Sequence, residues 1–223
     1  MTNNNPAYFS FNLFKLDTKW RWMADLAKEE SAHEVQNVLS NCNVQFRTYS
    51  TVGIRDDGDF MLWLSAPDVE TIQDVISKLY LTVFGKYIVP SRTYLSSSRD
   101  SKYAQNNLKP AFMSGEKSLK YVIVYPFIKT RSWYLLPSDQ RQKYMKEHIE
   151  IGQKYPQILL NTTYSFGIHD QDFMLAFETD DLVAFQDLIM DLRETKVSEY
   201  VQVDTPMITC VLKDVIPLIK SMG

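Results

Sequence analysis

The chain has 223 residues, of which 45% are hydrophobic and 23% are charged. This balance, with only seven glycines, excludes a disordered chain, a collagen-like repeat and a disulfide-rich scaffold. The 24 basic and 27 acidic side chains give a formal charge of −3, so we expect no nucleic-acid partner. No apolar run approaches the roughly 18 residues of a membrane span, and the N-terminus lacks secretion-signal features, so we expect a cytoplasmic location.

The two halves of the sequence repeat each other at an offset of 113 residues. The recurring positions include residues 59–62 and 172–175, both Asp-Phe-Met-Leu, Trp20 and Trp133, and Asp68 and Asp181. The Gly-Ile pair at 53–54 recurs at 167–168, one residue out of step, which a one-residue change in a loop explains. A shared register over the whole length indicates a tandem duplication.

Each half has the periodicity of a β-α-β-β-α-β unit. In the first half we predict a strand at 8–14, a helix at 20–39, hairpin strands at 44–52 and 60–64, a helix at 69–84 and a strand at 89–95. In the second half we predict a strand at 121–128, a helix at 138–155, hairpin strands at 158–165 and 173–177, a helix at 181–197 and a strand at 207–212. A short terminal helix follows Asp214. This order is typical of a ferredoxin-like half, with helices on one face of an antiparallel sheet.

The predicted fold class is therefore α+β, with tandem duplicated ferredoxin-like halves and antiparallel sheets. We assign residues 1–95 to the N-terminal half, 96–120 to a linker or lid loop, and 121–223 to the C-terminal half. Since an apolar free sheet face must be covered, we expect the two sheets to pair as a dimeric α+β barrel. The segment 96–120 is long for a simple connection, and such loops are often lids.

The duplication allows one half to be compared with the other. A site present in one half only should appear as a polar or titratable residue at a position where the other half has a residue of purely structural character. Three positions differ in this way, and all three polar or aromatic members belong to the second half. At the offset of 113 the pairs are Val35 and His148, Asn12 and Tyr125, and Thr48 and Asn161. We therefore expect a functional site in the second half.

His148 lies on a predicted helix stripe that also carries Met145, Gly152 and Tyr155. A glycine inside a helix costs about 1 kcal/mol relative to alanine, so Gly152 indicates that something approaches this face closely. A neutral imidazole is a good iron ligand, and a flat macrocycle needs a bare surface beside it. The alternative is a core histidine held by a hydrogen bond.

Alternation along the first strand of the second half places Tyr125, Phe127 and Lys129 on one face. A tyrosine there is able to donate a hydrogen bond or carry a radical, and a lysine is able to pair with an anion. The alternative is an aromatic core position followed by a charge at the end of the strand.

Three short motifs together resemble one family. Residues 125–129 read Tyr-Pro-Phe-Ile-Lys, residues 133–137 read Trp-Tyr-Leu-Leu-Pro, and residues 147–152 read Glu-His-Ile-Glu-Ile-Gly. The combination resembles the chlorite dismutase-like superfamily of haem proteins, and most closely its coproheme decarboxylase branch. The resemblance implies a haem cofactor, either coproheme or haem b, with its iron.

The resemblance also implies roles for individual residues. His148 would be the proximal ligand of the haem iron, and Tyr125 would be the redox-active tyrosine. Lys129 would lie near a propionate, and Ser198 stands where decarboxylases place a propionate-binding serine. Asn161 stands where chlorite dismutases have a distal arginine and decarboxylases a glutamine, so it is the expected distal residue.

Other departures from the family pattern bear on the reaction. Because no arginine stands at position 161 to hold an oxyanion over the iron, we expect no efficient chlorite decomposition. Val197 stands where chlorite dismutases carry a carboxylate next to the proximal histidine, as in decarboxylases. The arginine that decarboxylases place ahead of the tyrosine strand has no clear match, and Lys109 is the nearest basic residue.

The sequence thus predicts a haem-dependent oxidoreductase with peroxide-dependent coproheme decarboxylase chemistry. Its partners would be a porphyrin and hydrogen peroxide, and the resemblance implies a homopentamer. One alternative is a generic haem peroxidase or a weak chlorite-decomposing enzyme. Another is a non-catalytic haem-binding or carrier protein, or a duplicated barrel that binds no haem.

Overall fold

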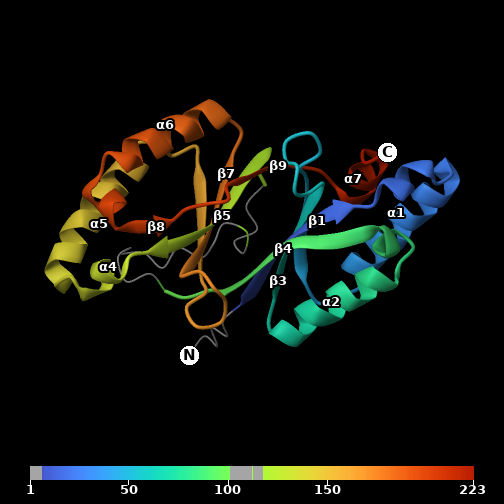
Figure 1. Cartoon of the computed structure of the whole chain (residues 1–223), viewed down its shortest axis with the longest axis horizontal. Helices are drawn as coiled ribbons and strands as arrows, with labels where there is room; N and C mark the ends of the chain where they lie inside the picture. Colours follow the sequence, from blue (N-terminus) through green and yellow to red (C-terminus); the bar gives the residue numbers. More distant parts are fainter. Residues whose placement is uncertain (1–6, 101–111, 113–117) are drawn as a thin grey trace. The chain divides into compact units, whose positions relative to one another are not determined.

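A computed structural model describes residues 7–100, 112 and 118–223 of the chain. The chain divides into two compact units (Figure 1). Unit 1 comprises Met1–Ser97 and Thr209–Gly223, and unit 2 comprises Ser98–Ile208. The last segment of the chain therefore groups with the first half, whereas the sequence-based boundary assigns everything from residue 121 onward to the second.

Unit 1 has a sheet with the strand order β4-β1-β3-β2-β9, and its pairs are antiparallel. Its strands are β1 (Tyr8–Leu16), β2 (Gln45–Ser50), β3 (Phe60–Ala66), β4 (Ile88–Ser97) and β9 (Ile208–Leu212). Its helices are α1 (Asp25–Ser40), α2 (Val69–Leu81) and α7 (Val215–Lys220), with 3₁₀ turns η1 (Thr18–Trp22) and η2 (Phe84–Tyr87). The short terminal helix predicted after Asp214 is confirmed as α7.

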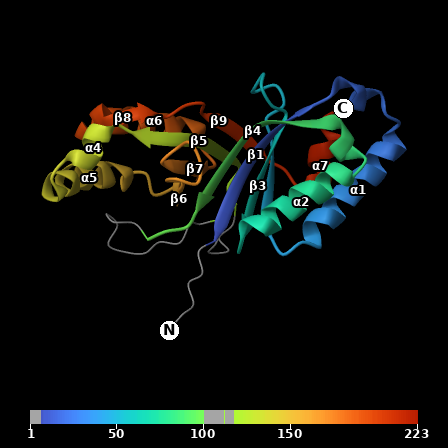
Figure 2. The same ribbon diagram turned by 60° about the horizontal axis from the view of Figure 1, so that its bottom comes forward.

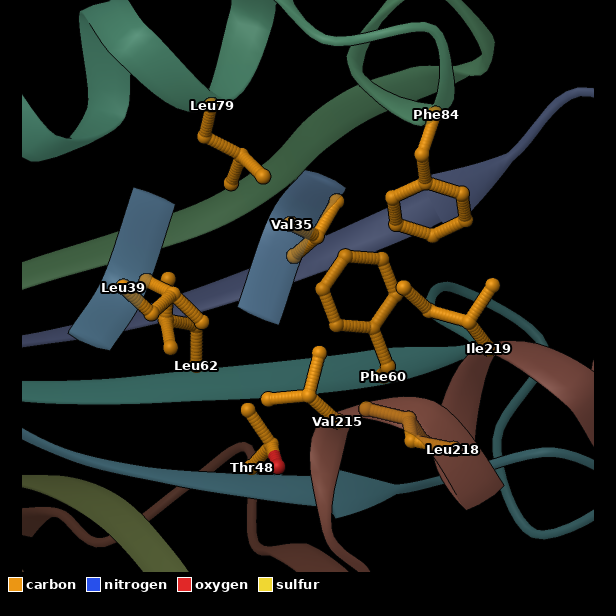
Figure 3. A pocket seen from close by; sticks show the side chains of 10 residues that line it. All are labelled: Val35, Leu39, Thr48, Phe60, Leu62, Leu79, Phe84, Val215, Leu218 and Ile219. Atoms are coloured by element: carbon orange, nitrogen blue, oxygen red, sulfur yellow. The ribbon is translucent and has the colours of Figure 1, made fainter. Parts of the chain in front are cut away.

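The helices α1, α2 and α7 lie on one side of the strands of unit 1 (Figures 1 and 2). Their apolar side chains and those of β3 point toward one another and line a small apolar cavity (Figure 3). The lining residues are Val35, Leu39, Thr48, Phe60, Leu62, Leu79, Phe84, Val215, Leu218 and Ile219. Since a fully buried Leu or Ile side chain contributes about 1.5–3 kcal/mol, α7 is an integral part of this core.

Unit 2 has the strand order β6-β7-β5-β8, again with antiparallel pairs. Its strands are β5 (Tyr121–Lys129), β6 (Leu159–Tyr164), β7 (Phe173–Thr179) and β8 (Val201–Val203). Its helices are α4 (Arg131–Leu135), α5 (Ser138–Gly152) and α6 (Leu182–Arg193), followed by the 3₁₀ turn η3 (Lys196–Tyr200). Helices α5 and α6 lie together on one side of β5, β6 and β7 (Figure 1).

Aspartates that recur at the offset of 113 have the same structural role in both units. Asp59 accepts a hydrogen bond from the Leu16 amide at 2.7 Å, and Asp172 accepts one from the Lys129 amide at 2.9 Å. The two aspartates thus fix the end of the first strand in each half. Asp68 and Asp181 both cap the helix that follows, as the sequence predicts. The repeated aspartates are therefore structural residues.

Four predicted helices are shorter than expected, and the one predicted at 138–155 ends with α5 at Gly152. The helix predicted at 20–39 is divided into η1 and α1, and those predicted at 69–84 and 181–197 end with α2 and α6. Equivalent threonines terminate the latter two. The Thr82 hydroxyl donates to the Leu79 carbonyl at 2.7 Å, and the Thr195 hydroxyl donates to the Leu192 carbonyl at 2.7 Å. A side chain that bonds the backbone locally competes with helix continuation.

Most of the predicted lid falls outside the described residues, which do not include 101–111 and 113–117. Lys109, the candidate for the missing arginine, lies there too. Phe112 is described, and its side chain is buried. Across residues 7–100 and 118–223, the model has no helix of the length and apolarity that crossing a membrane requires.

Candidate functional site

The sheet side of the candidate site is the face of β5 that carries Tyr125 and Phe127. Tyr125 is 3% exposed and packs in a core cluster with Phe177 and Phe185. Phe127 contacts the same cluster, as the alternation predicts. Burial raises the pKa of Tyr125 far above its usual value, because the phenolate is desolvated. The phenol therefore keeps its proton and is available as a hydrogen-bond donor.

Lys129 places a buried amine at the end of the same strand. Its side chain is 8% exposed, and Nζ has no hydrogen-bond partner within the described residues. Nζ lies 3.6 Å from the centroid of the Trp133 ring, which stabilises the charged amine. Desolvation nevertheless lowers the pKa of Lys129 to about 7, and the nearby carboxylate of Asp172 opposes the shift. The site thus contains an amine with unused donors.

Asp172 fixes the edge of the site from the β7 side. Its Oδ2 atom accepts hydrogen bonds from the Lys129 amide at 2.9 Å and from the Tyr134 hydroxyl at 2.6 Å. These bonds tie the end of β5 to α4. The direction in which Lys129 leaves the strand is therefore set by the backbone.

The helix side of the site is α5, which carries His148. The Nδ1 atom of His148 is buried and has no hydrogen-bond partner within the described residues. Burial and, to a smaller extent, the positive charge of Lys129 lower the pKa of His148 to about 4, although the carboxylate of Glu147 opposes the shift. The imidazole is therefore neutral at pH 7, as a metal ligand must be. The alternative of a core histidine held by a hydrogen bond finds no partner here.

The stripe of α5 that carries His148 faces the core of unit 2. Tyr155, on the same stripe, packs against the cluster around Tyr125, and its hydroxyl donates to Asp191 at 2.8 Å. Gly152 lies between them, and a Cβ atom added to it would meet nothing within 4 Å. No residue of α5 is fully buried, whereas α1 buries five, among them Val35 and Leu39. A side chain at Gly152, one turn from His148, would therefore meet open space among the described residues.

Two further differences between the halves escaped the sequence comparison. At the offset of 113, Lys129 stands where unit 1 has Leu16, and Gly152 stands where it has Leu39. Both leucines are buried in the core of unit 1. A buried leucine replaced by lysine or by glycine removes apolar contact and leaves a charge or a void. The sequence contains this signal. It is found by searching for positions at which an apolar residue of the first half is replaced by a charged residue or a glycine in the second.

The proposed equivalence of Asn161 and Thr48 is wrong by one residue. Thr48 pairs with Leu62 of β3. At the offset of 113, the residue equivalent to Leu62 is Leu175 of β7. Leu175 pairs with Thr162, so Thr162 and not Asn161 corresponds to Thr48. One extra residue therefore lies ahead of β6, and the loop after β6 is one residue shorter than its counterpart, which restores the offset of 113 at β7. Because side chains alternate along a strand, the extra residue reverses the face.

Asn161 consequently lies on the opposite face of the sheet from Tyr125. Tyr125 pairs with Leu175, and Asn161 pairs with the next residue, Ala176. The Nδ2 atom of Asn161 donates to the Ala176 carbonyl at 3.3 Å and to Glu178 Oε1 at 3.0 Å. Its Oδ1 atom accepts from the Phe112 amide at 3.0 Å. The structure thus does not bring Asn161 together with Tyr125, and its amide is occupied by buried protein groups.

The β6 side chains on the Tyr125 face are Leu160, Thr162 and Tyr164. Leu160 pairs with Phe177, Thr162 with Leu175 and Tyr164 with Phe173. Leu160 is 48% exposed, although it is apolar and next to a core cluster. These three residues, which the sequence comparison missed, are the β6 neighbours of the site.

Ser198 belongs to a separate polar group at the end of α6. Its hydroxyl contacts the carbonyls of Arg193 and Thr195, each at 2.7 Å. Arg193 Nη2 in turn lies 2.9 Å from Asp204 Oδ2. Asp204 and Arg193 also act on the pKa of Tyr125, which the carboxylate raises and the guanidinium lowers. Ser198 is thereby linked through Arg193 to the surroundings of Tyr125.

These residues fit a haem group. A haem iron takes its equatorial ligands from the macrocycle and needs one protein ligand, which His148 is able to supply. Within the described residues no group of three or more His, Cys, Asp or Glu side chains gathers to hold a metal ion. Lys129, with its unused donors, is suited to a porphyrin carboxylate. The space beside Gly152 allows a planar ligand to approach α5.

Comparisons with known proteins agree with this interpretation. The family model described as chlorite dismutase matches residues 28–213. The chain is 33% identical over 162 residues to the coproheme decarboxylase of Mycolicibacterium smegmatis, and the match covers 72% of this chain and 70% of the relative.

Solved structures support the fold. A mutant chlorite dismutase from Candidatus Nitrospira defluvii has a TM-score of 0.88 at 22% identity, over 96% of this chain and 94% of that one. The complex of that organism's chlorite dismutase with imidazole has a TM-score of 0.88 at 21% identity, with the same coverage. The predicted α+β fold with antiparallel sheets is confirmed.

Proposed function

Because the chain belongs to the chlorite dismutase family, we propose that it is a haem-dependent oxidoreductase that catalyses peroxide-dependent decarboxylation of coproheme. One observation carries the proposal. His148 Nδ1 and Lys129 Nζ are buried, neither has a hydrogen-bond partner among the described residues, and they are close enough for the charge of Lys129 to act on His148. Such groups cost stability, and a ligand that uses them repays that cost.

Each residue has a role in this proposal. His148 would bind the iron, and Lys129 would hold a propionate carboxylate. When bound, the haem supplies oxidising power from hydrogen peroxide, which is reduced to water as a propionate becomes a vinyl group and carbon dioxide. Tyr125 keeps its proton until oxidation, because burial raises its pKa. Its buried hydroxyl would orient the reacting carboxylate and pass the oxidation to it.

Within the described part of β6, no amide side chain lies on the Tyr125 face, which departs from the expected pattern. Asn161 is turned away, and Leu160 and Thr162 take the neighbouring β6 positions on the Tyr125 face. Leu160 gives no hydrogen bond to bound peroxide and Thr162 offers only a hydroxyl, so this observation favours a second candidate, a haem-binding protein without efficient catalysis. The cytoplasmic location and homopentameric assembly belong to the main proposal through the family.

Titration of the purified protein with ferric coproporphyrin and with haem b tests the proposal. We expect a Soret shift with coproporphyrin, followed by loss of propionate mass when peroxide is added. The Tyr125→Phe variant should bind the porphyrin but not decarboxylate it, whereas Tyr87→Phe in unit 1 should behave as the wild type. Decarboxylation at the wild-type rate by Tyr125→Phe would refute the assigned role, and binding without reaction in the wild type would favour the second candidate.

A further inference from the structure

An ion pair next to Tyr125 has no role in the function proposed above. Arg193 ends α6, Asp204 follows β8, and their Nη2 and Oδ2 atoms are 2.9 Å apart. Leu192 and Met207, which flank the pair in sequence, both pack against the core cluster that contains Tyr125. The ion pair therefore lies at the border of the core cluster that contains Tyr125.

Arg193 is held in position by its backbone and keeps unused donors. Its carbonyl accepts a hydrogen bond from the Ser198 hydroxyl at 2.7 Å, which fixes the end of α6. A guanidinium has five N–H donors and binds carboxylates best with two of them. The Arg193 side chain is 62% exposed, and Asp204 meets it through Nη2. A second carboxylate is thus able to reach the guanidinium from solvent.

Asp204 lies in a break that only the second half possesses. In unit 1 the strand β4 runs without interruption over Ile88–Ser97, but the equivalent stretch is divided between β8, which ends at Val203, and β9, which begins at Ile208. At the offset of 113, Asp204 takes the place of Ser91. The carboxylate is therefore a feature of the half that carries the candidate site.

We propose that Asp204 is a resident carboxylate that occupies Arg193 in the ligand-free protein and gives way to a carboxylate of the bound porphyrin. This inference rests on the proposed function. Asp204 thereby sets how tightly the site holds carboxylate-bearing porphyrins, because it competes for the guanidinium and repels the incoming negative charge. The electrostatic effect of both residues on Tyr125 places this competition next to the reacting carboxylate.

Binding of metal-free coproporphyrin, followed by its fluorescence, tests the inference without involving the iron or His148. The Asp204→Asn variant should bind the tetra-acid about threefold more tightly, the scale of an exposed ion pair. It should bind the tetramethyl ester, kept in solution by a non-ionic detergent, as the wild type does. Glu29→Gln is the matched control, because it breaks the 2.6 Å Lys220–Glu29 ion pair of unit 1 with the same change of net charge.

The Arg193→Leu variant completes the test. It should weaken binding of the tetra-acid, and adding Asp204→Asn to it should give a smaller gain than in the wild type, because only the repulsion and not the competition for the guanidinium is then relieved. The inference is overturned if Asp204→Asn leaves the affinity unchanged, if the ester gains as much as the acid, or if Glu29→Gln gives the same gain. Failure of the folded wild-type protein to bind either porphyrin would instead overturn the proposed function, and this inference with it.

Discussion

Units 1 and 2 share their order of elements but fill the space between helices and sheet differently. In unit 1 the side chains of α1 and α7 close this space with apolar contacts (Figure 3). In unit 2 the equivalent stripe of α5 carries His148 and Gly152, and no residue of α5 is fully buried. One copy of the duplicated unit is thus packed with apolar side chains, and the other carries a histidine and a glycine at the equivalent positions.

This difference between the units shows what a site costs in stability when it is placed in one copy of a duplicated fold. Buried polar atoms without partners destabilise a fold by about 1–3 kcal/mol each, so unit 2 keeps His148 Nδ1 and Lys129 Nζ at a cost. Unit 1 retains the apolar residues at the same positions, and the terminal helix α7 adds to its core. Exchanging residues between the halves therefore separates binding from stability, and three substitutions do so.

The largest effect is expected from giving unit 2 the valine of unit 1, His148→Val. Loss of the only proposed iron ligand should weaken haem binding by at least about 100-fold, which is the upper range seen when even indirect supports of a metal are removed. Soret titration measures the affinity, and thermal unfolding verifies the fold. His33→Ala, an exposed histidine of unit 1, is the control. Equal affinity in His148→Val and the wild type would remove His148 from the site.

A smaller effect is expected from Gly152→Leu, which restores the leucine of unit 1. The new side chain enters open space, and leucine favours a helix over glycine by up to about 1 kcal/mol, so stability should not fall. It should obstruct a planar ligand and weaken porphyrin binding about tenfold, as overfilled sites do. Urea unfolding and porphyrin titration are the two measurements.

The reciprocal variant Leu39→Ala controls for Gly152→Leu. It removes a buried side chain from the core of unit 1 and should cost about 2–5 kcal/mol of unfolding free energy without changing porphyrin affinity. A Gly152→Leu protein that binds porphyrin normally would show that the space beside α5 is not the binding site.

The smallest effect is expected from Lys129→Leu and concerns pH. In the folded protein the pKa of Lys129 is lowered to about 7 from 10.5, so between these values the unfolded chain binds more protons. Stability of the wild type should therefore rise with pH from 7 toward 10, and this rise should disappear in the variant. At pH 7 the variant should be more stable by about 1 kcal/mol, since no amine is desolvated. Urea unfolding at pH 7 and pH 9 measures both.

Two features refine the pH test. His148, with a pKa lowered to about 4 from 6.5, adds a similar rise only below pH 6.5, outside the chosen range. Lys154→Leu replaces an exposed lysine and should keep the wild-type slope. A Lys129→Leu protein with an unchanged slope would show that Lys129 is solvated and charged in the folded protein.

Much of the fold followed from the sequence because its signals are local. Alternation and helical spacing predicted the strands and helices of both halves, and the repeated aspartates predicted the helix starts at Asp68 and Asp181. The ends of the helices were less predictable, because the threonine hydroxyls at 82 and 195 terminate them through backbone contacts. Such a competition depends on geometry that spacing does not express.

The candidate site was only partly predictable for the same kind of reason. His148 and Tyr125 differ in chemistry from their counterparts, so the comparison of halves singled them out. Asn161 was assigned to the site through a register that is one residue in error, and it faces the opposite side of the sheet. Arg193 and Asp204 drew no attention, because an ion pair between distant residues leaves no periodic trace.

The duplication, the α+β class and the half that carries the unusual residues could be read from the sequence, because repeated residues and periodicity are local signals. The family resemblance rests on three short motifs. The folded structure was needed to establish which face of β6 meets Tyr125, that α7 completes the core of unit 1, and that Lys129 Nζ and His148 Nδ1 are buried without hydrogen-bond partners among the described residues. Strand register, burial and polar satisfaction depend on residues far apart in sequence, so they exist only once the chain has folded.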